Sequence, residues 1–426
     1  MSRLLAFRRV GFTFTAQIYN QIVIIAVQLL QVPFLLSAWG ADRYGGWLVL
    51  YAVPSYLTLS DFGFTLVAKN SMVMHAASSD HAGVLRVYHS VFALLLVAAA
   101  VILAACGLGI EAVTLTQAFA LGPLTETAAK LTILFLVGSV VVNQFLLLLC
   151  AGVRAAGRPA AEVTWGATSR LLEGIATVAV ALLTTRVELA ALAVLVMRVA
   201  CTLGLWIWLR SVAPDIPLGL KGARLAEIRR MANPSFSYML LGLAQALAIQ
   251  GPIVLLGAVA TAQETVLFST SRTLARMGTS AANLINYSFA PEYSRLHGQG
   301  NTSAFARLKR IHVLIGIAGI VAYCLGLWAL GPYVMELWTH GHVAVVYPFF
   351  ALLNAAVAAE MWWGCLFTPI AAINRHVRLS YLFVGLTAVC AVLAYSWALS
   401  EGATGIAAAL LLLHGGMSVL VLVLGR

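Results

Sequence analysis

Residues 209–235 read LRSVAPDIPLGLKGARLAEIRRMANPS and form the longest basic interval of the chain. The interval contains three prolines and five basic residues, Arg210, Lys221, Arg224, Arg229 and Arg230. Apolar runs long enough to cross a bilayer precede and follow it. We therefore predict that residues 209–234 link an N-terminal lobe at 1–208 to a C-terminal lobe at 235–426.

The composition on both sides of this interval is that of an integral membrane protein. Of the 426 residues, 62% are hydrophobic and only 10% are charged, and the mean hydropathy is +0.94. Runs of about 20 apolar residues mark the expected transmembrane helices. They lie near 14–38, 45–67, 89–111, 129–151, 163–185, 189–209, 235–257, 264–290, 311–335, 345–373, 380–400 and 403–424. The sequence thus predicts an all-α polytopic fold with 12 transmembrane helices in two six-helix lobes.

The net charge of +11 is explained by membrane topology. If the N-terminus is cytoplasmic, nineteen basic residues fall in the inside segments, and the outside loops hold only Arg43, Lys130 and Arg186. This bias predicts that both termini are cytoplasmic. A nucleic-acid partner is therefore not expected.

The six cysteines predict neither disulfides nor a metal site. All six lie inside apolar runs, without a CxxC pair and without His or acidic residues at ligand spacing. We interpret them as packing residues. No metal ion and no cofactor are expected.

The two lobes contain similar cytoplasmic segments at corresponding positions. MHAASSDHAGVLRVYHS (74–90) and YSRLHGQGNTSAFARLKRIHV (293–313) each lead from a polar loop into a basic segment before the third helix of a lobe. VRAAGRPA (153–160) and INRHVRLS (373–380) follow the fourth helices. The alternative is that the cytoplasmic loops of any polytopic protein look basic and similar. We favour a parallel duplication, which is a common plan for transporters.

The first predicted helix has one polar face. Its five amides fall within an arc of about 100° at helical spacing; they are Gln17, Asn20, Gln21, Gln28 and Gln31. An amide that faces lipid without a partner costs roughly 2 to 7 kcal/mol. This face is therefore expected to contact protein or water. Tyr51 belongs to a weaker polar stripe on the second helix.

The eighth predicted helix carries two arginines on a polar face. Its polar residues fall within about 80° and comprise Arg272, Arg276, Thr279, Asn283 and Asn286. At 1.5 Å per residue, Arg272 lies roughly 12 Å into the helix and Arg276 roughly 18 Å. An arginine near the midplane that faces lipid costs at least about 2.5 kcal/mol. We favour an aqueous cavity over structural salt bridges, and we favour Arg276 as the more deeply placed charge.

The other charged residues within predicted helices either form a predicted ion pair or are candidates for ion coupling. Arg170 and Glu173 are three residues apart, which predicts an ion pair within one helix that Arg198 joins. Glu360 is either the partner of a cavity arginine or a group that takes up a proton or cation, and these alternatives stay open. Asp61 lies near the cytoplasmic end of the second helix. Glu360 and Asp61 are the candidates for ion coupling.

Two long segments of the chain resemble a known family. VPFLLSAWGADRYGGWLVLYAVPSYLTLSDFGFTLVAKN (32–70) and LFSTSRTLARMGTSAANLINYSFAPEYSRLHGQGN (267–301), together with the twelve-helix plan, resemble the Wzx-type O-antigen flippases. These flippases are the polysaccharide-exporting branch of the multidrug, oligosaccharidyl-lipid and polysaccharide exporter superfamily. The part around YGGW and LSDFGF is the most specific.

The resemblance implies a bacterial inner-membrane protein that moves an undecaprenyl-diphosphate-linked oligosaccharide from the cytoplasmic to the periplasmic leaflet. It implies alternating access around a central cavity lined by the first, second, seventh and eighth helices, with H⁺ or Na⁺ as coupling ion. It also implies membrane lipids, a polysaccharide polymerase and a chain-length regulator as partners. Arg272 and Arg276 match the cationic cavity residues of the family. Related lipid II flippases also have cations on the first two helices and usually fourteen helices, and this chain departs from both features.

Two other functions are considered. A multidrug exporter of the same superfamily would favour acidic residues over arginines in its cavity. A membrane polymerase or ligase would need catalytic groups on a sizeable outside loop. The longest such loop here has about 17 residues (112–128), and no Ser/His/Asp set, carboxylate pair or metal cluster is evident in the sequence. We therefore do not expect an enzyme.

Overall fold

A computed structural model of the chain describes residues 2–55, 63–118, 121, 123–259, 262–339 and 343–425. Within these ranges the regular secondary structure is helical. The chain divides into two compact units, Met1–Ser235 and Phe236–Arg426. We describe each unit by itself.

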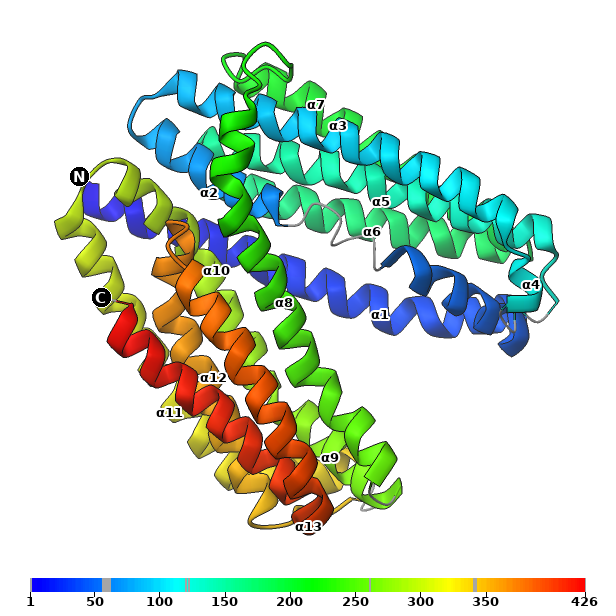
Figure 1. Ribbon diagram of the computed structural model, residues 1–426, viewed down its shortest axis with the longest axis vertical. Coiled ribbons are helices and arrows are strands. Elements are labelled where there is room, and N and C mark those ends of the chain that lie inside the picture. The colour runs from blue at the N-terminus through cyan, green and yellow to red at the C-terminus, as the bar shows by residue number, and fades with distance from the viewer. Residues whose placement is uncertain are drawn as a thin grey trace. The chain divides into compact units, whose positions relative to one another are not determined.

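Unit 1 contains seven helices and the start of an eighth (Figure 1). They are α1 (Ser2–Ser55), α2 (Phe64–Ala77), α3 (His81–Ala112), α4 (Leu115–Ala118), α5 (Glu126–Ala155), α6 (Pro159–Leu183), α7 (Val187–Val212) and α8 (Leu225–Val259). Helix α1 packs along α6, and α5 packs along α7. Because α5 also contacts α2, α3 and α6, it forms the centre of the unit.

Unit 2 contains most of α8 and five further helices. They are α9 (Ala262–Ala275), α10 (Met277–Gly298), α11 (Thr302–Trp338), α12 (Phe349–Ala372) and α13 (Val377–Leu424). Helix α12 packs along α13 and contacts α10, α11 and α9 (Figure 1). Functional groups on α12 are therefore within reach of four other helices.

Two pairs of predicted helices are each joined across one glycine. In α1 the chain turns at Gly40, whose φ is 72°, and the rings of Trp39 and Trp47 on its two sides lie edge to face, 5.6 Å apart. In α13 the turn is at Gly402, whose φ is 55°. A positive φ is accessible to glycine without a side-chain clash. The predicted breaks between 38 and 45 and between 400 and 403 are therefore turns made by single residues.

The second and eighth predicted helices were each expected to be continuous, but in the structure both are interrupted. The span predicted at 45–67 continues as the separate helix α2 after Gly63, whose φ is 79°. The span predicted at 264–290 is divided at Arg276 into α9 and α10. The two interrupted helices hold the same place in their lobes, which supports the predicted duplication.

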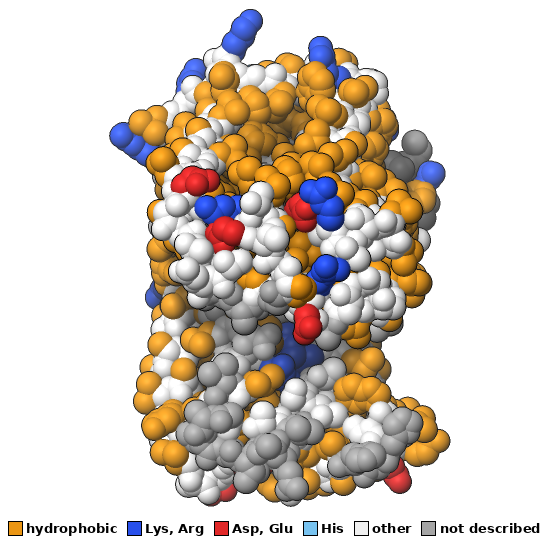
Figure 2. Space-filling model, turned by 90° about the vertical axis from the view of Figure 1, so that its right-hand side faces the viewer, with side chains coloured by type: hydrophobic (Ala, Val, Ile, Leu, Met, Phe, Trp, Pro, Cys, Tyr) orange, Lys and Arg blue, Asp and Glu red, His pale blue; other side chains and the backbone are white. Residues whose placement is uncertain are grey.

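The surface of both units is apolar enough to require a bilayer. Nine helices in the described ranges are long and apolar enough to cross one. The third helices of the two lobes, α3 and α11, are the least buried: 11% of the apolar window is buried in α3 and 0% in α11. Figure 2 shows apolar side chains over wide areas of the face that it presents. In water such patches would drive aggregation, so their favourable solvent is lipid.

The loops that precede α3 and α11 have the same geometry. A residue with positive φ, Ser79 or Gly300, follows each preceding helix. The next residue is the N-cap, and its side chain accepts a hydrogen bond from the third helical N–H: Gly83 N donates to Asp80, and Ala304 N donates to Asn301. This shared local structure also supports the duplication.

Part of the predicted linker is attached to unit 1. Residues 213–224 connect α7 to α8, and α8 begins at Leu225, inside the interval expected to be linker. His89 Nδ1 accepts from the N–H of Gly222 over 3.0 Å, and His89 Nε2 lies 2.9 Å from the carbonyl oxygen of Pro217. Ser90 Oγ accepts from the N–H of Arg224 over 2.9 Å. These bonds hold the connection against α3.

The predicted ion pair between Arg170 and Glu173 is wrong. Glu173 on α6 instead binds Arg198 on α7, which donates to both carboxylate oxygens. Arg198 also donates to the carbonyl of Ser139 on α5 over 3.2 Å. Arg170 is exposed and donates to Asn20 Oδ1 over 3.0 Å. The buried pair therefore joins two helices, whereas the expected spacing would have kept it within one.

Replacing the N-cap residues of α3 and α11 should separate the stabilisation due to the charge of Asp80 from the stabilisation due to capping alone. The N–H of Gly83 holds the pKa of the Asp80 carboxyl below its ordinary value of 3.8. The carboxylate thus stabilises the fold above about pH 3.8 and loses this effect as pH falls through the lowered pKa. We expect Asp80→Ala to lower the thermal midpoint at pH 7 and to lose this effect towards pH 3. Asn301→Ala is the control, with a pH-independent cost of about 1 kcal/mol. Equal pH dependence of the two variants would contradict the assignment.

Removing one partner of the α6–α7 ion pair should destabilise unit 1. Arg198→Met leaves the Glu173 carboxylate buried without a cation, at a cost of about 3 to 5 kcal/mol. The double variant with Glu173→Leu should recover most of this loss. Thermal unfolding in detergent measures both, and Arg170→Met, at an exposed site, is the matched control. Destabilisation by Arg170→Met as large as that by Arg198→Met would show that the pair is not what holds these helices together.

Candidate functional site

Arg276 lies at the junction between α9 and α10. Its φ and ψ are −69° and −8°, and its carbonyl oxygen accepts from Ser280 N at 3.2 Å and from Thr279 Oγ1 at 2.8 Å. Hydroxyl groups that bond back to the helix backbone in this way bend helices. Directly after the junction, Gly278 lets α10 approach α11, because a Cβ there would lie 2.4 Å from Tyr323. The junction and the close approach together position the Arg276 side chain beside α12.

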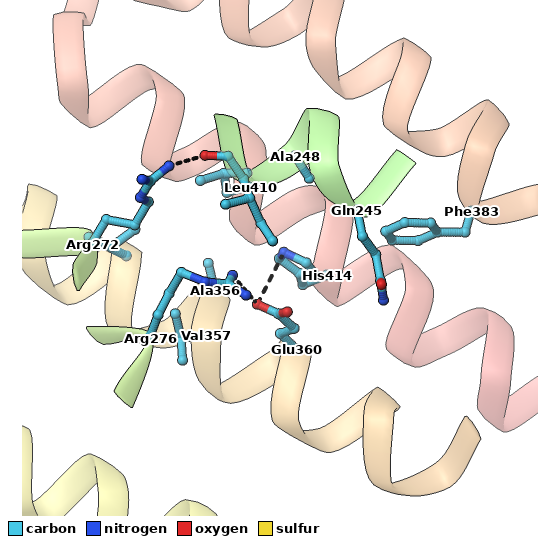
Figure 3. Close-up of a pocket in the computed structure, with 12 residues that line it drawn as sticks. Gln245, Ala248, Arg272, Arg276, Ala356, Val357, Glu360, Phe383, Leu410 and His414 are labelled. Atoms are coloured by element: carbon cyan, nitrogen blue, oxygen red, sulfur yellow. Dashed lines mark hydrogen bonds and ion pairs between the residues drawn. The ribbon is translucent and has the colours of Figure 1, made fainter. Parts of the chain in front are cut away.

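The carboxylate of Glu360 on α12 is the partner of Arg276. Nη1 of Arg276 donates to Oε2 of Glu360 over 3.1 Å, and Figure 3 shows the two side chains pointing at each other. The side chains are 28% and 17% exposed, respectively. The sequence left two alternatives open for Glu360, and the structure contains the first of them, an arginine partner.

A histidine that the sequence did not single out completes this cluster. His414 on α13 is buried, and its Nε2 lies 3.8 Å from the same Glu360 oxygen (Figure 3). Its Nδ1 accepts a hydrogen bond from Trp363 Nε1 over 3.2 Å. The signal that could have identified His414 is its isolation as a titratable residue in a long apolar run.

Arg272 is held differently. Its Nη1 donates to the carbonyl oxygen of Ile249 on α8, and Figure 3 shows its side chain directed away from Glu360. A carbonyl oxygen has two lone pairs, so Ile249 can accept this bond in addition to one within the helix. Among the described residues no carboxylate forms a salt bridge with Arg272. Its positive charge is therefore hydrogen-bonded and not neutralised.

These side chains line a pocket that lies entirely within unit 2. The pocket has a cavity volume of about 20 Å³ and is bounded by α8, α9, α12 and α13. Besides the charged groups, its wall includes Gln245, Phe383 and Leu410. With His414 neutral, the two arginines and Glu360 give the pocket a formal charge of +1. This arrangement suits an anionic group better than a cationic one.

The asparagines predicted on the same face lie elsewhere. Asn286 is buried and its Oδ1 lies 2.9 Å from His312 Nε2 on α11. The Nδ1 of His312 is in turn 3.2 Å from the hydroxyl of Tyr293. Asn283 is exposed. The structure therefore brings Arg272 and Arg276 together but does not bring either asparagine into their pocket.

The described candidates in unit 1 differ in their burial and in their partners. Gln17 is buried, Asn20 accepts from Arg170, and Gln21 and Gln31 are half-buried. The Gln28 side chain and Asp61 lie outside the described residues. Among these candidate amides of α1, Asn20 thus accepts a hydrogen bond from a charged group.

Tyr51 is 48% exposed, and its ring lies 5.7 Å from that of Trp47.

Within the described ranges the structure contains no group of three or more His, Cys, Asp or Glu residues that could hold a metal ion. The described cysteines are all free thiols.

Sequence comparison does not assign the chain to a family. No protein-family model matches it, and no curated protein matches it. The family implied by the resemblance of residues 32–70 and 267–301 is thus left to be tested on other grounds.

Solved structures, in contrast, match the chain over nearly its whole length. A structure of MATE in the bent conformation has a TM-score of 0.80 at 12% identity and covers 99% of this chain and 95% of its own. An outward-facing multidrug resistance MATE family transporter of the MOP superfamily has a TM-score of 0.75 at 12% identity, with the same coverage.

A third structure comes from Pyrococcus furiosus. It is a MOP superfamily transporter whose reverse polarity of binding pocket is said to suggest a different function, and it has a TM-score of 0.70 at 12% identity. The match covers 98% of this chain and 95% of that one. This chain therefore has the fold of MATE transporters of the MOP superfamily, which confirms the predicted all-α polytopic membrane fold.

Proposed function

We propose that the chain is a membrane transporter whose substrate carries an anionic group, and that this group is the diphosphate of a lipid-linked oligosaccharide. The transporter fold supports the general part of this proposal. The positively charged pocket of unit 2 supports the choice of an anion. Arginine suits a diphosphate because its planar guanidinium offers paired donors and stays protonated.

One observation carries the choice of substrate charge: no described carboxylate neutralises Arg272. Its guanidinium donates to the Ile249 carbonyl, which leaves most of its donors for a ligand. Arg276 also lines the pocket, but Glu360 already neutralises it. We therefore assign the first contact with substrate to Arg272, whereas the sequence alone favoured the more deeply placed Arg276.

The second candidate is export of cationic drugs, and the multidrug resistance transporter among the structural neighbours favours it. A cationic ligand would need an acidic residue without a partner. Glu360 is the acidic residue in this pocket, and Arg276 is bound to it. The Pyrococcus furiosus transporter, with its reverse polarity of binding pocket, is a neighbour for which a different function is suggested. The charge of the pocket favours the anionic substrate here.

The remaining parts of the proposal rest on the resemblance and the charge bias of the loops. We place the chain in a bacterial inner membrane with both termini cytoplasmic. The oligosaccharide moves to the periplasmic leaflet by alternating access, with H⁺ or Na⁺ as coupling ion. A polysaccharide polymerase and a chain-length regulator are the proposed partners downstream.

Replacing Arg272 should impair substrate binding and translocation. Loss of a charge-assisted hydrogen bond is worth about 1.5 to 3 kcal/mol, or about tenfold to a hundredfold in affinity. We expect Arg272→Ala to weaken binding of a short-chain isoprenyl-diphosphate sugar by this factor. Titration in detergent measures affinity, and accessibility of the sugar to an external lectin in proteoliposomes measures translocation.

The control removes an exposed arginine of unit 1. Arg210 lies over the ring of Trp206, 5.2 Å from its centroid, and Arg210→Ala should leave both readouts unchanged. Wild-type affinity of Arg272→Ala for the diphosphate would contradict the assignment. Tight binding of a lipophilic cation that Glu360→Gln abolishes would favour the multidrug exporter.

A further inference from the structure

The charges of the unit 2 pocket do not match those of the proposed substrate. A diphosphate that links a lipid to a sugar carries one negative charge on each phosphate. The pocket supplies two arginines, but Glu360 neutralises one of them through its 3.1 Å contact with Arg276. A substrate that used both arginines would therefore have to displace this carboxylate. An unpaired carboxylate beside a diphosphate would be repelled by it.

Resting on the proposed function, we propose that substrate binding takes up one proton at Glu360. The diphosphate replaces the carboxylate as the counterion of Arg276, and one proton from water adds to a Glu360 oxygen to form an O–H bond. Because Glu360 is then a neutral carboxylic acid, the pocket keeps the positive charges of both arginines. Two cations meet two phosphate charges, so that no uncompensated charge is left in an apolar environment.

The geometry assigns the proton to Glu360 and not to His414. The indole N–H of Trp363 can only donate, so His414 Nδ1, which lies 3.2 Å from it, must accept. The ring hydrogen of neutral His414 is thus on Nε2, which faces Glu360. Protonation of His414 would place two N–H groups against each other at Nδ1. His414 therefore lies beside the carboxyl group of Glu360 without carrying the proton itself.

The groups around Glu360 come from the helices that contact α12 and from α8, which also lines the pocket. The α9–α10 segment contributes Arg272 and Arg276, and α13 contributes His414. Helix α11 contributes Tyr323, whose hydroxyl lies 3.5 Å from Asn354 Oδ1. Helix α8 contributes Gln245, which does not titrate. Arg276 thus binds the Glu360 carboxylate by direct contact. When Arg276 binds a diphosphate instead, Glu360 loses its counterion, and this loss favours protonation of Glu360.

The linkage has a defined sign. If binding takes up a proton, low pH favours binding, and the dissociation constant rises by up to about tenfold per pH unit as pH increases. Glu360→Gln mimics the protonated acid and frees Arg276 in advance. We expect this variant to bind at least as tightly as wild type at neutral pH, with an affinity that does not change with pH.

The test is calorimetric titration of the full chain in detergent with a short-chain isoprenyl-diphosphate N-acetylglucosamine. Titration in two buffers of different ionisation enthalpy gives the number of protons taken up. We expect about one for wild type and none for Glu360→Gln. His414→Gln, which keeps a donor beside Glu360, should still take up about one proton.

The outcomes separate this inference from the proposed function. No binding by wild type would sink the proposed function and the inference with it. Binding by wild type without proton uptake, or uptake that persists in Glu360→Gln, would overturn the inference alone. Uptake that is lost in His414→Gln and kept in Glu360→Gln would move the proton to His414 and would also overturn it.

Discussion

The structure depends on a rule for charges in apolar surroundings: a carboxylate that leaves water needs a cation. An unpaired buried carboxylate costs several kcal/mol, and lipid supplies no counterion. In unit 1, Glu173 ties α6 to α7 through Arg198. Glu162, at the start of α6, binds Arg154 on α5 and lies 2.7 Å from Lys69 on α2.

In unit 2 the same rule brings α12 to the α9–α10 junction through Glu360 and Arg276. Arg272 is itself a cation, and it is stabilised differently, by a hydrogen bond to a backbone carbonyl. A dipole stabilises a guanidinium but leaves its charge in place, so the pocket keeps an attraction for anions. The choice of partner for these two arginines therefore decides which ligand charge the pocket favours.

The sequence predicted features that follow from composition and from one helix at a time. Span length and hydropathy are local properties, so the all-α membrane fold could be predicted. Contacts between distant helices could not. The partner of Arg276 is 84 residues away, and its identity stayed open. His414 was missed because a histidine in an apolar run has no local partner to mark it.

Two expectations came from treating helices as regular and isolated. Asn286 was placed with the arginines by counting about 100° per residue along one helix, whereas the structure has two helices, α9 and α10, and Asn286 contacts His312 outside the arginine pocket. Arg170 and Glu173 have the spacing of a pair, yet Arg198 from the next helix binds both carboxylate oxygens. Where a second helix offers a bidentate arginine, spacing within one helix does not decide the pairing.

The two units share a scaffold but not its charges. Gly157 and Asn374, both with positive φ, end the fourth helix of each lobe, and Arg198 and His414 follow them at almost the same distance along the chain. In unit 1 this position holds a permanent cation that is bound to Glu173. In unit 2 it holds a histidine that Trp363 keeps neutral, which leaves Glu360 to Arg276. A fixed pair stabilises helices, whereas a pair held by one exchangeable contact can respond to a ligand. The proposed anion site therefore contains an ion pair of the exchangeable kind, whereas the Glu173–Arg198 pair of unit 1 is of the fixed kind.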